Sequence, residues 1–262
     1  MEINEKGGMD MSKISMINNS IYTDYGKIAS GKAIQSAVDG AAELGIIQRQ
    51  QMQVNTYDTG ADNIKAASGL ANITDSALSG ISDYLGRIHE LSIRSMNGTM
   101  SDSDKAGIQA EIDQMLQGIE QFAGTAMYNE TYLLNGTSED INVASGLGNM
   151  SVSTGNMTLK ALGLDGYNIM GDFNLEDVEN AMDKVSKLRS KVGAQTNALE
   201  YAYNYTTSAS LNTTASQSRL EDLDYPKAIS EQKKKEVLQE YALTMQKKFI
   251  ENEVNLAQRL FL

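Results

Sequence analysis

The segment Gly26–Lys32 contains residue types that could bind a phosphate. Its letters, GKIASGK, have the glycine and lysine spacing of a P-loop, in which backbone N–H groups and the lysine surround the phosphates. Ala33 stands where such a loop has the Ser or Thr that holds Mg²⁺, and no buried-strand pattern precedes the segment. The motif is incomplete, so the sequence does not predict a nucleotide cofactor.

A second group of residues has the spacing of calcium ligands. Positions one, three, six and twelve of an EF-hand-like loop are occupied by Asp102, Asp104, Gly107 and Asp113. Ala106 occupies another ligand position, however. Ser101 followed by Asp104 also resembles a helix capping box, and carboxylates favour the positive end of a helix. The capping interpretation needs fewer assumptions, so we expect a helix start here and no metal site.

The remaining reactive residue types give no catalytic constellation. The chain has no Cys and a single histidine, His89, which lacks a second ligand or a nucleophile nearby in the pattern. The 14 Met residues are spread through apolar stripes, where they serve as packing residues. We therefore predict no catalytic residues, no cofactor and no metal, and we expect that the protein is not an enzyme.

The acidic charge balance of the chain disfavours two classes of binding partner, nucleic acids and membranes. The chain has 262 residues with 22 Lys and Arg against 34 Asp and Glu, and its pI is about 4.6. Such a balance disfavours binding to nucleic acid or to an anionic membrane surface. No apolar run is long enough for a spanning helix, and residues 1–6 are polar, unlike a signal peptide. We expect neither nucleic acid nor membrane as a partner.

The elements expected to carry these residues are long helices. Apolar residues recur at helical spacing from 60 to 96, which predicts one helix. A second stripe with heptad steps should pack against it as a hairpin partner: Ile108, Ile112, Met115, Ile119 and Phe122. Residues 135–172 are rich in Gly, Asn, Ser and Thr and predict a small β-hairpin region. Helical periodicity then resumes from Val178 to Leu199.

Both ends of the chain have the pattern of helices that need partners. Ile14, Ile17, Ile21, Tyr25 and Ile28 have helical spacing near the start, and residues 227–262 form a loose apolar stripe after Pro226. Half of residues 203–218 are Ser or Thr, which are weak helix formers, so this segment alone should be disordered. These patterns favour helices that are ordered by contact with other molecules.

Several motifs, in order, resemble those of one family. Residues 29–46, ASGKAIQSAVDGAAELGI, resemble the bacterial flagellin signature SSGLRINSAxDDAAGLAI. The likeness continues through 60–99, 108–114 and 133–136, and it returns in VGAQTNALE (192–200) and SQSRLEDLD (216–224). The chain departs from the family pattern at Ala33, Gly40 and Glu43 and over residues 255–262, which puts some subunit contacts in doubt. The sequence is identified as similar to a minimal flagellin.

The resemblance implies a mainly α fold: an elongated rod of long antiparallel, coiled-coil-like helices from the N- and C-terminal halves, with a small central β-hairpin region. The expected parts are a filament-core helix and linker (1–50), the N-terminal part of the rod (51–134), the short variable hairpin region (135–172), the C-terminal part of the rod (173–205) and a C-terminal filament-core helix (206–262).

The resemblance also implies a function and partners. The protein would polymerise with itself into the extracellular flagellar filament for swimming, after export in unfolded form by the flagellar type III route. A flagellar export chaperone, cap proteins and hook-junction proteins would be its other partners. The alternatives are a minor subunit at the hook-filament junction, or a secreted ligand or adhesive module.

A further implied partner is the Toll-like flagellin receptor of innate immunity. In the family this receptor is bound by an Arg, a Leu and a Glu, which match Arg87, Leu91 and Glu111. Arg94 stands where the family usually has Gln. Exposed arginines can be binding hot spots or ordinary surface residues, so filament-lining or solvated roles are the alternative for these three positions.

Overall fold

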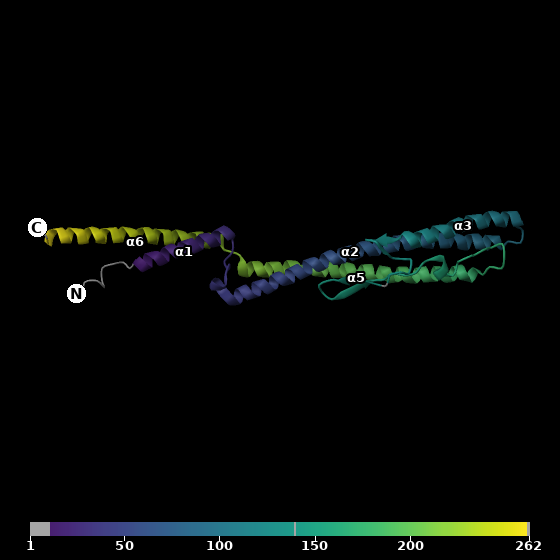
Figure 1. Ribbon diagram of the computed structural model, residues 1–262, viewed down its shortest axis with the longest axis horizontal. Helices are drawn as coiled ribbons and strands as arrows, with labels where there is room; N and C mark the ends of the chain where they lie inside the picture. The colour runs from purple at the N-terminus through teal and green to yellow at the C-terminus, as the bar shows by residue number, and fades with distance from the viewer. Residues whose placement is uncertain (1–10, 139, 261–262) are drawn as a thin grey trace. The chain divides into compact units, whose positions relative to one another are not determined.

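The computed structural model describes residues 11–138 and 140–260, and these residues form two compact units (Figure 1). The terminal unit combines Met1–Met52 with Asn212–Leu262, and the central unit is Gln53–Leu211. The boundaries between the units fall within two long helices. Among the described helices, none has the length and apolarity needed to cross a bilayer.

The fold is mainly α, as predicted. The helices are α1 (Met11–Ser30), α2 (Ala37–Ser95), α3 (Asp102–Thr125), α4 (Leu159–Leu162), α5 (Leu175–Glu221) and α6 (Tyr225–Leu260); the strands are β1 (Met127–Tyr128), β2 (Thr131–Tyr132), β3 (Ile141–Ala144) and β4 (Asn149–Val152). The helix predicted over 60–96 is the C-terminal part of α2. The capping box at Ser101 and Asp104 opens α3.

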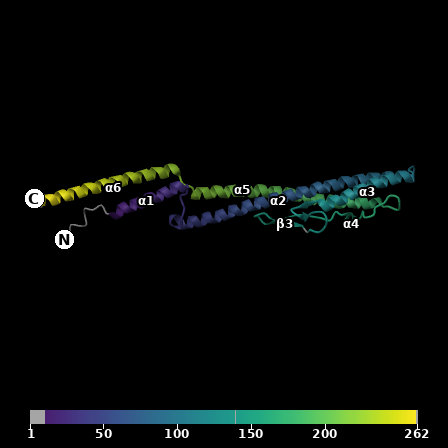
Figure 2. The same ribbon diagram turned by 45° about the horizontal axis from the view of Figure 1, so that its top comes forward.

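In the central unit, α2, α3 and α5 lie side by side along their lengths (Figures 1 and 2). α3 and α5 both run antiparallel to α2, as the cross-helix pairs Arg87–Glu111, Asp75–Arg189 and Asp58–Ser210 show. Apolar positions at helical spacing face one another and are almost fully buried: Ile64, Leu78, Ile81, Leu85, Ile88, Ile112, Ile119, Val178, Val185, Val192 and Leu199. One continuous hydrophobic core therefore joins the three helices.

Two glycines bring α2 and α3 close together. The Tyr84 ring of α2 lies over Gly118 of α3, and the Phe122 ring of α3 lies over Gly80 of α2. A Cβ on Gly118 would lie 2.6 Å from the Tyr84 ring, and one on Gly80 would lie 2.8 Å from the Phe122 ring. The two rings contact each other with centroids 5.7 Å apart. Glycine thus makes room for an aromatic ring on each helix.

The predicted β-hairpin region contains β3 and β4, which pair antiparallel with Val143 opposite Met150. A second pair, β1 and β2, lies before residue 135 and was missed. Its two turn residues, Asn129 and Glu130, both have positive φ, at 45° and 66°. That conformation fits a tight two-residue hairpin turn, but glutamate is not a usual residue for it, so the residue types here do not predict a turn.

The β3–β4 hairpin is held between α2 and α5 by side-chain amides. Asn63 of α2 donates from Nδ2 to the Ala144 carbonyl oxygen over 3.0 Å. Directly after β4, the Ser153 N–H donates to Oε1 of Gln195 of α5 over 2.9 Å. Beyond β3, the backbone of Ser145 passes so close to α2 that a Cβ on Gly60 would lie 2.3 Å from the Ser145 carbonyl oxygen. The hairpin tip is therefore seated directly on the α2 backbone.

In the terminal unit, α1 and α6 pack antiparallel through mainly polar contacts. Lys235 Nζ lies 2.6 Å from Asp24 Oδ2 and donates to Ser20 Oγ over 2.8 Å. The Tyr25 hydroxyl donates to Glu236, whose carboxylate raises the pKa of Tyr25 by hydrogen bond and charge. Among the described side chains of this unit, the buried hydrophobic ones are Ile21, Ile47 and Ala242. The apolar core of this unit is small.

Residues 203–218, expected to be disordered when alone, form the last turns of α5. Two of their weak helix formers are buried and bonded: Thr206 Oγ1 donates to the Ala202 carbonyl, and Ser210 Oγ donates to Asp58 over 2.6 Å. Packing against α2 thus offsets the low helix propensity of these residues, as tertiary contacts commonly do.

Candidate functional site

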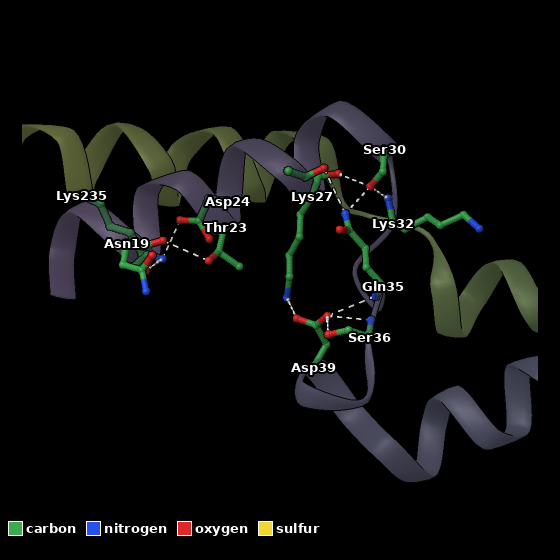
Figure 3. Close-up of polar contacts among 12 residues, drawn as sticks. Asn19, Thr23, Asp24, Lys27, Ser30, Lys32, Gln35, Ser36, Asp39 and Lys235 are labelled. Atoms are coloured by element: carbon green, nitrogen blue, oxygen red, sulfur yellow. Dashed lines mark hydrogen bonds and ion pairs between the residues drawn. The ribbon is translucent and has the colours of Figure 1, made fainter. Parts of the chain in front are cut away.

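A cluster of polar contacts in the terminal unit joins α1 to the start of α2 (Figure 3). Lys27 Nζ lies 2.6 Å from Asp39 Oδ1, while Asp39 Oδ2 accepts from the backbone N–H groups of Gln35 and Ser36. The hydrogen bond from Lys27, followed by those from Gln35 and Ser36, lowers the pKa of Asp39 far below its usual value. Asp39 is therefore an anion that both caps α2 and ties it to α1.

A second set of bonds joins the α1–α2 connector to the α5–α6 connector. The Ala33 N–H donates to the Glu221 carbonyl over 2.7 Å, and the Leu223 N–H donates to the Gly31 carbonyl over 2.9 Å. Lys32 Nζ lies 2.5 Å from Glu221 Oε1 and lowers the pKa of this carboxyl. Gly31 has a φ of 73° and ends α1. We call this site, residues 27–39 with 221–225, the connector joint.

The P-loop-like segment belongs to the connector joint and has no phosphate-binding geometry. Residues 27–30 are the last turn of α1, and the Gly31 N–H donates to the Lys27 carbonyl as a helix end. Lys27 and Lys32, the cations that a phosphate would need, are paired with Asp39 and Glu221. The signal that could have revealed the joint is Ser36 followed three residues later by Asp39, half of a capping box.

The EF-hand-like residues lie in the first turns of α3 and do not form a ligand loop. Ser101 caps the helix, and its hydroxyl and backbone N–H both donate to Asp104, which lowers the pKa of Asp104. A different acidic segment lines a hollow of about 460 Å³. Its lining residues include Asp165, Asp172 and Asp177. Within the described residues, no cluster of three or more His, Cys, Asp or Glu is arranged to hold a metal ion.

The three residues predicted for receptor binding lie together but differ in exposure. Arg87 Nη2 lies 3.1 Å from Glu111 Oε1 across the α2–α3 pair, and Arg87 Nη1 lies 3.0 Å from Glu90. The hydrogen bonds that Arg87 donates to Glu90 and Glu111 raise the pKa of Arg87. Leu91 is only 1% exposed and belongs to the core. The accessible part of this site is therefore the ion-pair network, while Leu91, one turn further along α2, is buried in the core.

His89 is placed on the α2 surface next to α5, where its Nε2 lies 3.4 Å from Glu179 Oε1. Its side chain is partly exposed. This geometry suits a polar contact at the surface.

Exposed apolar side chains are concentrated on α6. At least two-fifths of the accessible surface is exposed for Val237, Leu238, Tyr241, Leu243, Met245, Ile250, Val254 and Leu256. Of the predicted stripe, Phe249 is 39% exposed, and Leu260 lies outside the described side chains. On α1, Met16, Tyr22 and Tyr25 are also exposed. Exposed apolar surface of this extent marks a site of interaction with another molecule.

Two family models match the chain. Residues 9–139 match the bacterial flagellin N-terminal helical region, and residues 175–257 match the bacterial flagellin C-terminal helical region. The unmatched part between them holds the β3–β4 hairpin and α4.

Individual relatives agree with the family models. The chain is 30% identical to the flagellar filament 33 kDa core protein of Treponema phagedenis, over 84% of this chain and 85% of that one. It is 28% identical to the flagellin of Listeria monocytogenes, over 84% of each. Among solved structures, Bacillus cereus flagellin matches with a TM-score of 0.50 and 27% identity, over 60% of this chain and 94% of that one. A putative flagellar hook-associated protein from Vibrio parahaemolyticus shares the fold, with a TM-score of 0.55 and 15% identity, over 71% of this chain and 98% of that one.

Proposed function

Since this chain belongs to the bacterial flagellin family and is a structural subunit of the extracellular flagellar filament, we propose that its terminal unit completes its packing only when copies assemble. The observation that carries the proposal is the imbalance between the exposed apolar surface of α6 and the small core beneath it. Neighbouring copies would cover this surface, and its burial would offset the conformational entropy lost on ordering the helices.

Charge distribution supports the same assignment. Residues 1–52 and 212–262 together have 13 Lys and Arg against 14 Asp and Glu, so the terminal unit is nearly neutral. The central unit has 9 against 20 and carries almost all of the net charge. Closely packed copies of a strongly charged surface would repel one another, whereas a neutral unit avoids this cost. The terminal unit is thus the part best suited to close packing among copies.

Hydrogen exchange tests this proposal. We expect amides of α1 and α6 to exchange rapidly in the monomer and to become protected in the polymer. Amides of α2 between Gly60 and Ser95, whose core is complete within one chain, should be protected in both states and serve as the internal control. Electron microscopy of the same samples identifies the filaments. Full protection of α1 and α6 in the monomer would contradict assembly-coupled packing.

The route to the filament and the other partners follow from family membership. We propose that the chain is exported unfolded by the flagellar type III route, and that an export chaperone, cap proteins and hook-junction proteins bind it before or during assembly. A structural, non-enzymatic role agrees with the family. A junction subunit is the alternative; the likeness to the putative hook-associated protein of Vibrio parahaemolyticus concerns the fold alone.

We also propose that the exposed pair Arg87–Glu111 is recognised by the Toll-like flagellin receptor. The pair bridges α2 and α3 on the surface of the central unit, where both side chains are about half exposed. Leu91 would act indirectly, because it is buried in the core and supports the packing of α2. An arginine at the centre of an interface can carry much of the binding energy.

Reporter cells that express the receptor test this assignment. Arg87→Ala should reduce activation by about tenfold or more if Arg87 is a binding hot spot. Arg189→Ala is the matched control, because it removes an equally charged residue of α5 from another exposed ion pair, with Asp75 of α2. Absence of activation by the parent protein, or equal loss in both variants, would refute the assignment.

A further inference from the structure

The turn between α2 and α3 contains two neighbouring residues that can react with each other. Asn97 and Gly98 are adjacent in the chain, and both are exposed. The side-chain amide carbon of Asn97, Cγ, is an electrophile, and the backbone nitrogen of the next residue can attack it within the chain. Glycine favours this attack, because it has no Cβ to hinder the approach and its backbone adopts more conformations than that of other residues.

The Asn97 side chain is folded back along the turn, and its oxygen is already polarised. Asn97 Oδ1 accepts a hydrogen bond from the Thr99 N–H over 3.1 Å and a second from Thr99 Oγ1 over 2.9 Å. The ring of atoms that the first bond closes includes the Gly98 nitrogen, so nucleophile and electrophile are held near each other. Attack on Cγ places negative charge on Oδ1, and two donors aimed at that atom stabilise such a charge.

The same tripeptide occurs a second time in the chain, in a restrained setting. Asn135, Gly136 and Thr137 repeat the sequence and the two hydrogen bonds to Asn Oδ1, over 3.0 and 2.6 Å. Asn135 forms an isolated antiparallel bridge with Asn156, and a Cβ on Gly136 would lie 2.5 Å from Asn156 Nδ2. Attack by the Gly136 nitrogen requires the Asn135 backbone to rotate, which this bridge opposes. At Gly98, in contrast, a Cβ would meet no described atom within 4 Å.

We infer that Asn97 is a site of self-modification by deamidation, a property separate from the proposed function. The Gly98 nitrogen forms a bond to Asn97 Cγ while its proton passes to the leaving amide nitrogen; the Cγ–Nδ2 bond breaks, ammonia departs and a cyclic succinimide remains. Water then opens the ring at either carbonyl carbon and yields aspartate or isoaspartate. Both products add a negative charge to the turn, and isoaspartate also adds a backbone atom between α2 and α3.

Peptide mapping of the intact chain tests the inference, with Asn135 as the reference in the same sample. After incubation at neutral pH, mass spectrometry measures the conversion of each amide to an acid. Enzymatic methylation of isoaspartate identifies the succinimide path, since direct hydrolysis gives aspartate only. We expect Asn97 to convert at least about tenfold faster than Asn135 in the folded chain, because reaction at Asn135 first requires local opening.

Unfolding the chain in urea is the control for this comparison. The two rates should then become similar, because the tripeptides are identical and the bridge to Asn156 is lost. Equal rates at Asn97 and Asn135 in the folded chain would overturn the inference. Absence of isoaspartate at Asn97 would overturn it as well, and neither result would affect the proposed assembly.

Two variants of the turn test its two features separately. Gly98→Ala should fold like the parent, because the φ of Gly98 lies outside the left-handed region and the new Cβ meets open space. It should slow conversion of Asn97 at least about threefold, since the backbone becomes less permissive. Thr99→Val keeps the backbone N–H but removes the hydroxyl donor, and it should slow conversion by about threefold or more. An unchanged rate in either variant would overturn the role assigned to that residue.

Discussion

Gly60→Ala is expected to displace the β3–β4 hairpin from α2 and to destabilise the central unit by about 1–3 kcal/mol, the usual cost of overpacking. The new Cβ would lie 2.3 Å from the Ser145 carbonyl oxygen and 2.9 Å from the Gly146 nitrogen. Both atoms belong to the backbone, so the contact cannot be relieved by rotating a side chain. Gly146 itself has positive φ and lies close to the Thr56 carbonyl, which restricts the hairpin tip further.

Gly69→Ala is the matched control for Gly60→Ala. Gly69 lies in the same helix, and a Cβ there would meet no described atom within 4 Å. Alanine favours a helix over glycine by about 0.5–1 kcal/mol, so the control should be slightly more stable than the parent. Urea unfolding followed by circular dichroism gives both values. Equal stability of the two variants would show that the hairpin tip does not rest on α2.

Leu85→Ala is expected to destabilise the central unit by about 2–5 kcal/mol, because it removes three buried carbons and leaves a cavity. Leu85 is fully buried where α2 meets the other helices of the core. Ile93→Ala, on the same helix at a half-exposed position, should change the stability by no more than about 0.5–1 kcal/mol. The free energy of unfolding in urea distinguishes the two. Similar losses would contradict a core centred on this seam.

Much of the central unit could be predicted from sequence because its signals are local and periodic. Ile108, Ile112 and Ile119 are spaced as a helix seam requires, and all three are buried. The capping box at Ser101 depends on two residues three apart and is present as predicted. The predicted stripe of α3 includes Met115, but Leu116 is the buried residue and Met115 is only partly buried. Two adjacent apolar residues leave the position of the buried stripe ambiguous by one residue.

The features that were missed depend on contacts between distant residues or on unusual backbone conformation. The connector joint brings Lys32 next to Glu221. The local sequence around either residue does not predict that the two segments are in contact. The helix expected to begin near Gly60 instead extends back to Ala37, with a break at Gly40 where φ and ψ are not helical. The receptor residues were found by resemblance, but the burial of Leu91 depends on packing that the motif does not contain.

The amides of Asn63 and Gln195 have a consequence beyond holding the hairpin. Asn63 engages the carbonyl of Ala144, the last residue of β3, and Gln195 engages the N–H of Ser153, the residue after β4. Open strand edges recruit strands from other chains and begin cross-β aggregation. Because the two amides occupy these backbone groups, the groups are not available to pair with a strand of another chain.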